Sequence, residues 1–169
     1  MKHDVFLHCI APKTTAQASL RFTKQGQMFK DKRGVACRDT WVSLLAPYRP
    51  EEPFSKPCMV KAVFTWPWRK AEPKKNRELG WLPMNTKPDL DNLSKIFLDS
   101  MVTCGFLLSD QIVWKLVLMK GWGDKCGVHL VIDDDWEAIA DKVKERLKKE
   151  YNEHTTDITG MGEQGRTGE

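Results

Sequence analysis

Several features are scarce in this sequence of 169 residues, and each absence excludes a class of protein. No run of about eighteen apolar residues occurs, so we expect no membrane-spanning helix. The five cysteines are widely and irregularly spaced without a CxxC pair, and there are only four histidines. This pattern argues against a structural zinc site and a disulfide framework, and it indicates free thiols in a reducing cytoplasm. A glycine-rich phosphate loop and a nucleophile elbow are also absent.

The apolar stretch at the N-terminus is short, is interrupted by His8 and is not followed by a small-residue cleavage site. We therefore expect no signal peptide. The chain is long enough for one domain with a hydrophobic core and too short for two of ordinary size.

Positive charge is concentrated in parts of the chain, although the net charge is only +4. Residues 1–38 contain eight basic residues against two acidic ones, whereas residues 134–169 are net acidic. A second basic segment contains Arg69, Lys70, Lys74, Lys75, Arg77 and Lys87. Such segments suit the phosphates of a nucleic acid. A solvated surface with a solubilising tail explains the same charges equally well.

Apolar periodicity predicts alternating strands and helices. We expect strands at residues 5–10, 27–30, 58–68, 111–119 and 127–132, and helices at 38–48, 91–101 and 136–151. The strand at 111–119 is apolar on both sides, so we expect it to be central and to form a hairpin with the strand at 127–132. Residues 69–86 read as a long polar connector.

This order of elements predicts an α+β fold, with helices packed on a mixed sheet of about four strands. We expect a single domain at residues 1–151. From residue 152 the sequence is rich in Thr, Gly and Glu and lacks apolar periodicity. Residues 152–169 are therefore predicted to be an acidic, disordered tail.

Two carboxylates, Asp89 and Asp91, flank the expected start of the helix at 91–101, and Asp110 follows nineteen residues after Asp91. Carboxylates that converge from separate elements provide the hard oxygen ligands that Mg²⁺, or Mn²⁺, prefers. A cation held in this way would activate water for phosphodiester hydrolysis. The alternative is that one of the first two carboxylates only caps the helix.

Lys95 lies four residues after Asp91, on the same face of the expected helix. Its ammonium group either contacts a phosphate as charge develops in the transition state or forms a weak surface ion pair with Asp91. Asp99 is a further four residues along, where we expect it to hold Lys95 in place rather than to bind metal. Asn92 either orients a neighbouring carboxylate or caps the helix.

Tryptophans flank the basic connector. The alternation of the strand at 58–68 places Trp66 in the core. Trp81 follows Gly80 and is the better candidate to stack on a DNA base.

The pattern Pro-Asp-x-Asp-Asn-Leu-x-Lys at residues 88–95, followed by Asp110-Gln111-Ile112, resembles the RusA family of phage and prophage Holliday-junction resolvases. The resemblance covers residues 87–113. It implies that Asp89, Asp91 and Asp110 are catalytic carboxylates that bind Mg²⁺ and that Lys95 is a catalytic lysine. It also implies a homodimer, in the cytoplasm of a bacterial or phage-infected cell, that resolves four-way DNA junctions by symmetric paired nicks in recombination and repair.

The sequence departs from the family pattern at two places. Leu108 and Ser109 precede Asp110 where family members often have a further carboxylate, and Lys87 stands where arginine is common. Two alternatives to a junction resolvase stay open. One is a broader nuclease acting on branched DNA such as replication forks, and the other is a non-catalytic junction-binding protein whose carboxylates are only helix caps.

Overall fold

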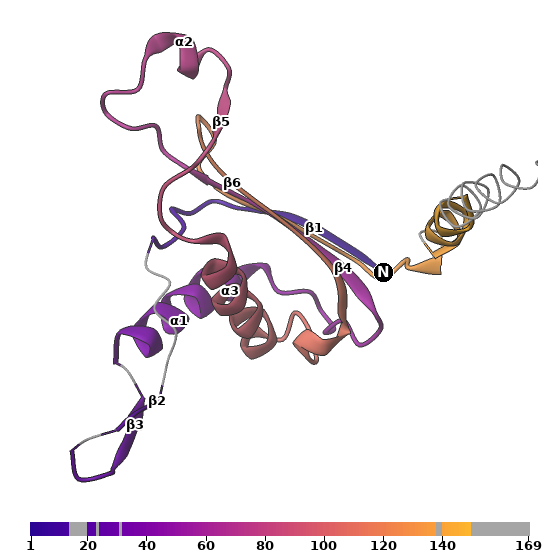
Figure 1. Cartoon of the computed structure of the whole chain (residues 1–169), viewed down its shortest axis with the longest axis horizontal. Coiled ribbons are helices and arrows are strands. Elements are labelled where there is room, and N and C mark those ends of the chain that lie inside the picture. Colours follow the sequence, from indigo (N-terminus) through magenta and orange to yellow (C-terminus); the bar gives the residue numbers. More distant parts are fainter. Residues whose placement is uncertain (14–19, 23, 31, 138–139, 150–169) are drawn as a thin grey trace, which may run out of the picture. The chain divides into compact units, whose positions relative to one another are not determined.

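The computed structural model describes residues 1–13, 20–22, 24–30, 32–137 and 140–149 (Figure 1). It divides the chain into two units, Met1–Asp134 and Asp135–Glu169. In the second unit, residues 140–149 are helical, in agreement with part of the helix predicted at 136–151. The predicted tail at 152–169 lies outside the described residues, so its disorder and the expected domain boundary at residue 151 stay predictions.

The first unit is built on a five-stranded mixed sheet with the strand order β1-β7-β4-β6-β5. The strands are β1 (Lys2–Leu7), β4 (Cys58–Trp66), β5 (Trp81–Pro83), β6 (Val113–Gly123) and β7 (Gly127–Asp133). Strands β4 and β6 are parallel, and the other neighbouring pairs are antiparallel. The predicted α+β class with a mixed sheet is confirmed.

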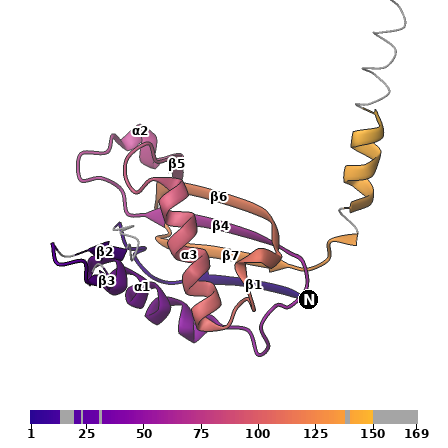
Figure 2. The ribbon, with the colours of Figure 1, turned by 60° about the horizontal axis from the view of Figure 1, so that its bottom comes forward.

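Two helices, α1 (Lys32–Leu45) and α3 (Leu90–Cys104), cover one face of this sheet (Figure 2). Alternate residues of β4 are fully buried, including Val60, Ala62 and Phe64, as the period of a strand requires. Trp41 of α1 meets the rings of Phe64 and Phe97 edge-on, with centroids 5.9 Å and 5.2 Å apart. The core therefore lies between β4 and the two helices.

Helix α3 confirms the helix predicted at 91–101 and extends it at both ends. Its apolar residues recur at helical spacing, and Leu93, Ile96, Phe97 and Met101 are buried. Gly105 ends the helix in the left-handed conformation, at φ 79°, and its N–H donates to the carbonyl groups at the helix end. This firm anchoring fixes the residues on the exposed side of α3.

Two predictions about β6 are wrong. Strands β6 and β7 do not form a hairpin, because β4 lies between them and pairs with both. Strand β6 is not central along most of its length, because β5 pairs only with residues 121–123. Trp114, Leu116 and Met119 are consequently 42%, 39% and 38% exposed. Apolar residues on both sides of a strand indicate burial on average, but here they line a sheet edge.

Short elements account for the other differences. The predicted connector at 69–86 contains α2 (Lys74–Arg77) and β5. A separate two-stranded sheet joins β2 (Leu20–Phe22), which was not predicted, to β3 (Met28–Lys30), which confirms the strand expected at 27–30. Helix α1 begins before residue 38 and continues into the turn η1 (Ala46–Tyr48), and η2 (Asp110–Ile112) precedes β6.

The five cysteines are all free, as predicted. Burial, together with the nearby Asp134 carboxylate, raises the pKa of the Cys58 thiol to about 11, so this thiol is unreactive at neutral pH. Among the described residues, no helix is both long and apolar enough to cross a membrane.

Candidate active site along helix α3

Asp89 and Asp91 lie at the start of α3 with exposed side chains. Asp89 occupies the N-cap position, with φ −69° and ψ 136°, and its carbonyl accepts the first helical hydrogen bond from the Leu93 N–H at 3.0 Å. Its side chain makes no capping hydrogen bond. The carboxylate therefore does not perform the structural role that an N-cap aspartate usually has, and it is available for a ligand.

The segment that carries Asp89 is held by a lysine from β6. Lys120 Nζ donates to the carbonyl oxygens of Thr86 and Pro88, at 2.8 Å and 2.6 Å. The Lys120 carbonyl in turn accepts from the Met84 N–H at 3.0 Å. Strand β6 thus fixes the backbone directly before Asp89. Lys120 was not predicted from the sequence, where it follows directly after the strand predicted at 111–119 and its only signal is a charge after the apolar residues 116–119.

Lys95, Asp99 and Asp110 line one pocket of about 580 Å³. Helix α1 contributes Arg38 and Gly34 to the same pocket. Asp110 begins η2, where the Ser109 hydroxyl accepts from the Gln111 N–H at 3.2 Å. The fold therefore brings the predicted lysine together with one of the three predicted carboxylates.

Asp91 lines a smaller pocket of about 340 Å³ with Leu116 and Leu118 of β6. Ser94 lines both pockets, and its hydroxyl donates to the Asp91 carbonyl at 2.6 Å. The two pockets therefore adjoin each other beside α3, with Asp91 in one and Asp110 in the other.

No group of three or more His, Cys, Asp or Glu side chains in the described part of the chain is arranged to hold a metal ion. The chemistry of Asp89, Asp91 and Asp110 nevertheless fits Mg²⁺, because all three offer hard oxygen donors. Mg²⁺ in such enzymes is commonly bound by one or two carboxylates, with water and substrate phosphate as the remaining ligands. The residues therefore fit a cation that binds with DNA, and the full three-carboxylate set stays a prediction.

Lys95 has two expected partners along the helix, Asp91 and Asp99. Across residues 32–137, no ion pair joins Lys95 to Asp91 or to Asp99, although Asp99 lines the same pocket. Asn92 is half-buried at the start of α3. The supporting roles predicted for Asp99 and Asn92 stay predictions.

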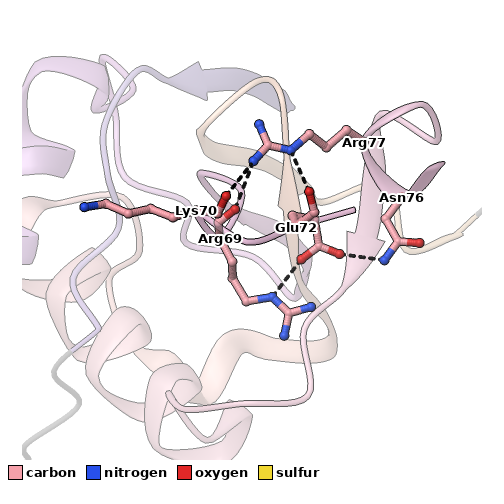
Figure 3. A network of polar contacts seen from close by, with 5 residues as sticks. All are labelled: Arg69, Lys70, Glu72, Asn76 and Arg77. Carbon is pink, nitrogen blue, oxygen red and sulfur yellow. Dashed lines mark hydrogen bonds and ion pairs between the residues drawn. The ribbon is translucent and has the colours of Figure 1, made fainter. Parts of the chain in front are cut away.

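The basic connector forms a built structure, shown in Figure 3, which we call the basic lobe (residues 69–80). At its centre is Glu72, only 6% exposed, whose carboxylate accepts from Arg69 Nε at 2.7 Å and Asn76 Nδ2 at 2.6 Å. Arg77 donates to the carbonyl groups of Glu72, Arg69 and Lys70. The hydrogen bonds from Arg69 and Asn76 lower the pKa of Glu72.

The six cations predicted to bind DNA therefore divide into two groups. Arg69 and Arg77 hold the basic lobe together. Lys70, Lys74 and Lys75 are exposed on the lobe, and Lys87 is exposed shortly before α3.

The two tryptophans singled out in the sequence both belong to the fold. Trp66 is fully buried, as predicted, and its Nε1 donates to the Ala11 carbonyl at 2.7 Å. The ring of Trp81 packs on β6, because a Cβ atom added at Gly121 would lie only 2.2 Å from its Cε2. Trp81 is half-buried, and its role as the better candidate to stack on a DNA base stays a prediction.

A comparison with protein families gives one finding that bears on this site. The family model described as endodeoxyribonuclease RusA matches residues 10–133, which is more than half of the chain. The matched segment contains both pockets, the basic lobe and Lys120. No curated protein matches the chain.

Proposed function

Because this chain belongs to the RusA family of endodeoxyribonucleases, which hydrolyse phosphodiester bonds in DNA at Holliday junctions, we propose that it is a Mg²⁺-dependent junction resolvase. It would cut two strands of a four-way junction by symmetric nicks. The family membership supports the class of reaction, and the site along α3 supports the assignment of residues.

The observation that carries this proposal is the uncapped carboxylate of Asp89. The residue stands at a helix N-terminus, where a capping hydrogen bond is normally formed, and its side chain makes none. Lys120 holds the preceding backbone from β6. A polar side chain that is positioned in this way without a structural partner suits ligand binding.

In the proposed site, Asp89, Asp91 and Asp110 bind Mg²⁺, with Mn²⁺ as a substitute. When bound, the cation activates a water molecule and neutralises charge on the phosphate. Lys95 contributes its positive charge to the phosphate as negative charge develops there. Asp99 lines the same pocket as Lys95 and would hold it in place.

We place DNA along the basic lobe and the site. Lys70, Lys74, Lys75 and Lys87 would contact phosphates directly, and Arg69 and Arg77 would maintain the shape of the lobe. Symmetric nicking requires two sites related by a two-fold axis, so the active form would be a homodimer. The free cysteines suit a protein that acts in the reducing cytoplasm of a bacterial or phage-infected cell.

Cleavage of three substrates tests the proposal. An immobile four-way junction, a replication fork and a linear duplex of the same sequence are incubated with the protein, with and without Mg²⁺. We expect paired nicks in the junction only, and only with the cation. Equal cleavage of the fork would indicate a broader branched-DNA nuclease. Binding of the junction without cleavage in Mg²⁺ or Mn²⁺ would indicate a non-catalytic junction-binding protein and contradict the proposal.

A further inference from the structure

Arg38, in the wall that α1 forms around the larger pocket, has a hydrogen-bonding group without a partner. Its Nε atom is buried and has no acceptor among the described residues. Its Nη2 atom lies 3.7 Å from Oδ1 of the neighbouring Asp39, which is too far for a hydrogen bond. A buried donor without an acceptor destabilises a fold, so an acceptor supplied by a ligand would explain it.

The surroundings of Arg38 indicate what this ligand is. Arg38 lines the same pocket as Lys95, which comes from the other helix, and as Asp99 and Asp110. Gly34 lies one turn before Arg38 in α1, on the same side, and lines the pocket without a side chain. The pocket therefore stays open beside two cationic groups from two helices.

We infer that Arg38 binds a phosphate group of the DNA strand that is cut, an inference that rests on the proposed function. The planar guanidinium group offers Nε and Nη donors in parallel, which matches two oxygens of one phosphate. Lys95 provides a single point charge in the same pocket. Since Asp99 and Asp110 repel a phosphate, a second cation offsets their charge, and Arg38 also fixes the orientation of the phosphate.

Single-turnover cleavage of a saturating four-way junction in Mg²⁺ tests this role with the full chain. Arg38→Ala should reduce the rate about 10²-fold, the effect of losing one preorganised donor to a reacting group. Arg38→Lys should recover only part of the rate, because lysine keeps the charge and lacks the planar pair of donors. Arg49→Ala is the matched control, since Arg49 is exposed and lines a different pocket. Equal rates for Arg38→Ala and Arg49→Ala would overturn the inference.

The midpoint of thermal unfolding distinguishes a purely structural role of Arg38 from phosphate binding. Should Arg38→Ala fail to fold, Arg38→Lys decides, because it keeps the charge and most of the length. A lower rate in Arg38→Lys at an unchanged midpoint supports the phosphate contact, and an unchanged rate overturns it.

A titration with inorganic phosphate gives a readout that needs no nuclease activity. The arginine Nε–H signals are followed by NMR in the wild-type protein. We expect the Arg38 signal to shift while the Arg49 signal stays in place, and an unmoved Arg38 signal would overturn the phosphate site. If the wild-type protein cuts no branched DNA and the Arg38 signal still shifts, the proposed function fails and the phosphate site remains.

Discussion

The ammonium group of Lys95 shares a pocket with the Asp110 carboxylate, and no ion pair ties it to Asp91 or Asp99 within the described segment 32–137. Lys95→Ala should therefore leave the thermal midpoint unchanged, because the substitution breaks no ion pair with either carboxylate. The cleavage rate should fall about 10²-fold, on the scale of removing one charged group that stabilises the transition state. Single-turnover kinetics and thermal melting of the same preparation measure the two effects.

Lys56→Ala is the matched control for Lys95, because Lys56 is an exposed lysine before β4. It should change neither the rate nor the midpoint. A Lys95→Ala protein that melts several degrees lower and cuts at the wild-type rate would show that Lys95 stabilises α3 and does not take part in cleavage.

Among the secondary-structure elements, β6 is connected to the segment before α3 through two hydrogen bonds from Lys120. Lys120→Met keeps the aliphatic side chain and removes both bonds. Residues that orient metal ligands typically change metal affinity by 10–100-fold when they are replaced, so the Mg²⁺ concentration for half-maximal cleavage should rise about tenfold. Junction binding without metal should be unchanged.

Lys115→Met is the control on the same strand, since Lys115 is exposed. The Mg²⁺ dependence of this variant should match that of the wild-type protein. If Lys120→Met also keeps the wild-type Mg²⁺ dependence, β6 does not position the Asp89 carboxylate.

The basic lobe contains two kinds of cation. Three lysines are exposed for DNA binding, whereas Arg69 and Arg77 hold the lobe together. Changing Lys70, Lys74 and Lys75 together to alanine should weaken junction binding and make the slope of log K against log salt shallower, by about one unit for each phosphate that is no longer neutralised. Sequence preference at the cut should stay the same, because these lysines bind the DNA backbone. Binding is measured by fluorescence anisotropy at several salt concentrations without divalent cation.

Changing Lys142, Lys144 and Lys148 to alanine provides the control, because it removes the same charge from the helical residues 140–149. A salt slope that falls equally in both triple variants would show that total charge, and not the basic lobe, sets the affinity.

Glu72 makes the basic lobe sensitive to acid. Hydrogen bonds from Arg69 and Asn76 lower its pKa from the usual 4.5. Because the pKa of Glu72 is lower in the folded lobe than in the unfolded chain, the charged carboxylate stabilises the lobe at pH values above the unfolded-state pKa. This stabilisation is lost as the pH falls through the lowered pKa of the folded state. The NMR amide signals of residues 69–80 should therefore stay sharp from neutral pH to about pH 4.5 and broaden below it.

Glu72→Gln removes the charge at every pH, so its lobe signals should already be broad at neutral pH. Sharp signals in Glu72→Gln at neutral pH would show that the carboxylate does not hold the lobe.

Across the molecule as a whole, the long and strongly periodic elements could be predicted from the sequence. The alternation of Val60, Ala62 and Phe64 predicts β4, and Leu93, Ile96 and Phe97 predict α3, because each pattern reflects one buried face. The confirmed family follows from the motif at residues 88–95. These features depend on residues that are close together in the sequence.

The features that could not be predicted depend on contacts between distant segments. Strand β4 lies between β6 and β7, and no local pattern reveals a strand inserted between two neighbours in the sequence. The short elements α2 and β5 depend on such contacts. Glu72 accepts hydrogen bonds from Arg69 and Asn76, and the ring of Trp81 packs on Gly121. Lys120 braces the candidate site through bonds to residues more than thirty positions away.

Cleavage of a four-way junction by Asp89→Asn beside the wild-type protein, in Mg²⁺, tests the proposed site most directly. We expect the wild-type protein to nick the junction, and Asp89→Asn to bind it at least as tightly without cutting it. Removal of the carboxylate takes away a metal ligand and reduces repulsion of the phosphates. Asp91→Asn and Asp110→Asn should behave in the same way, whereas Glu52→Gln, at an exposed carboxylate before β4, should cut normally. Cleavage by Asp89→Asn at the wild-type rate would contradict the assignment of Asp89 as a metal-binding catalytic residue.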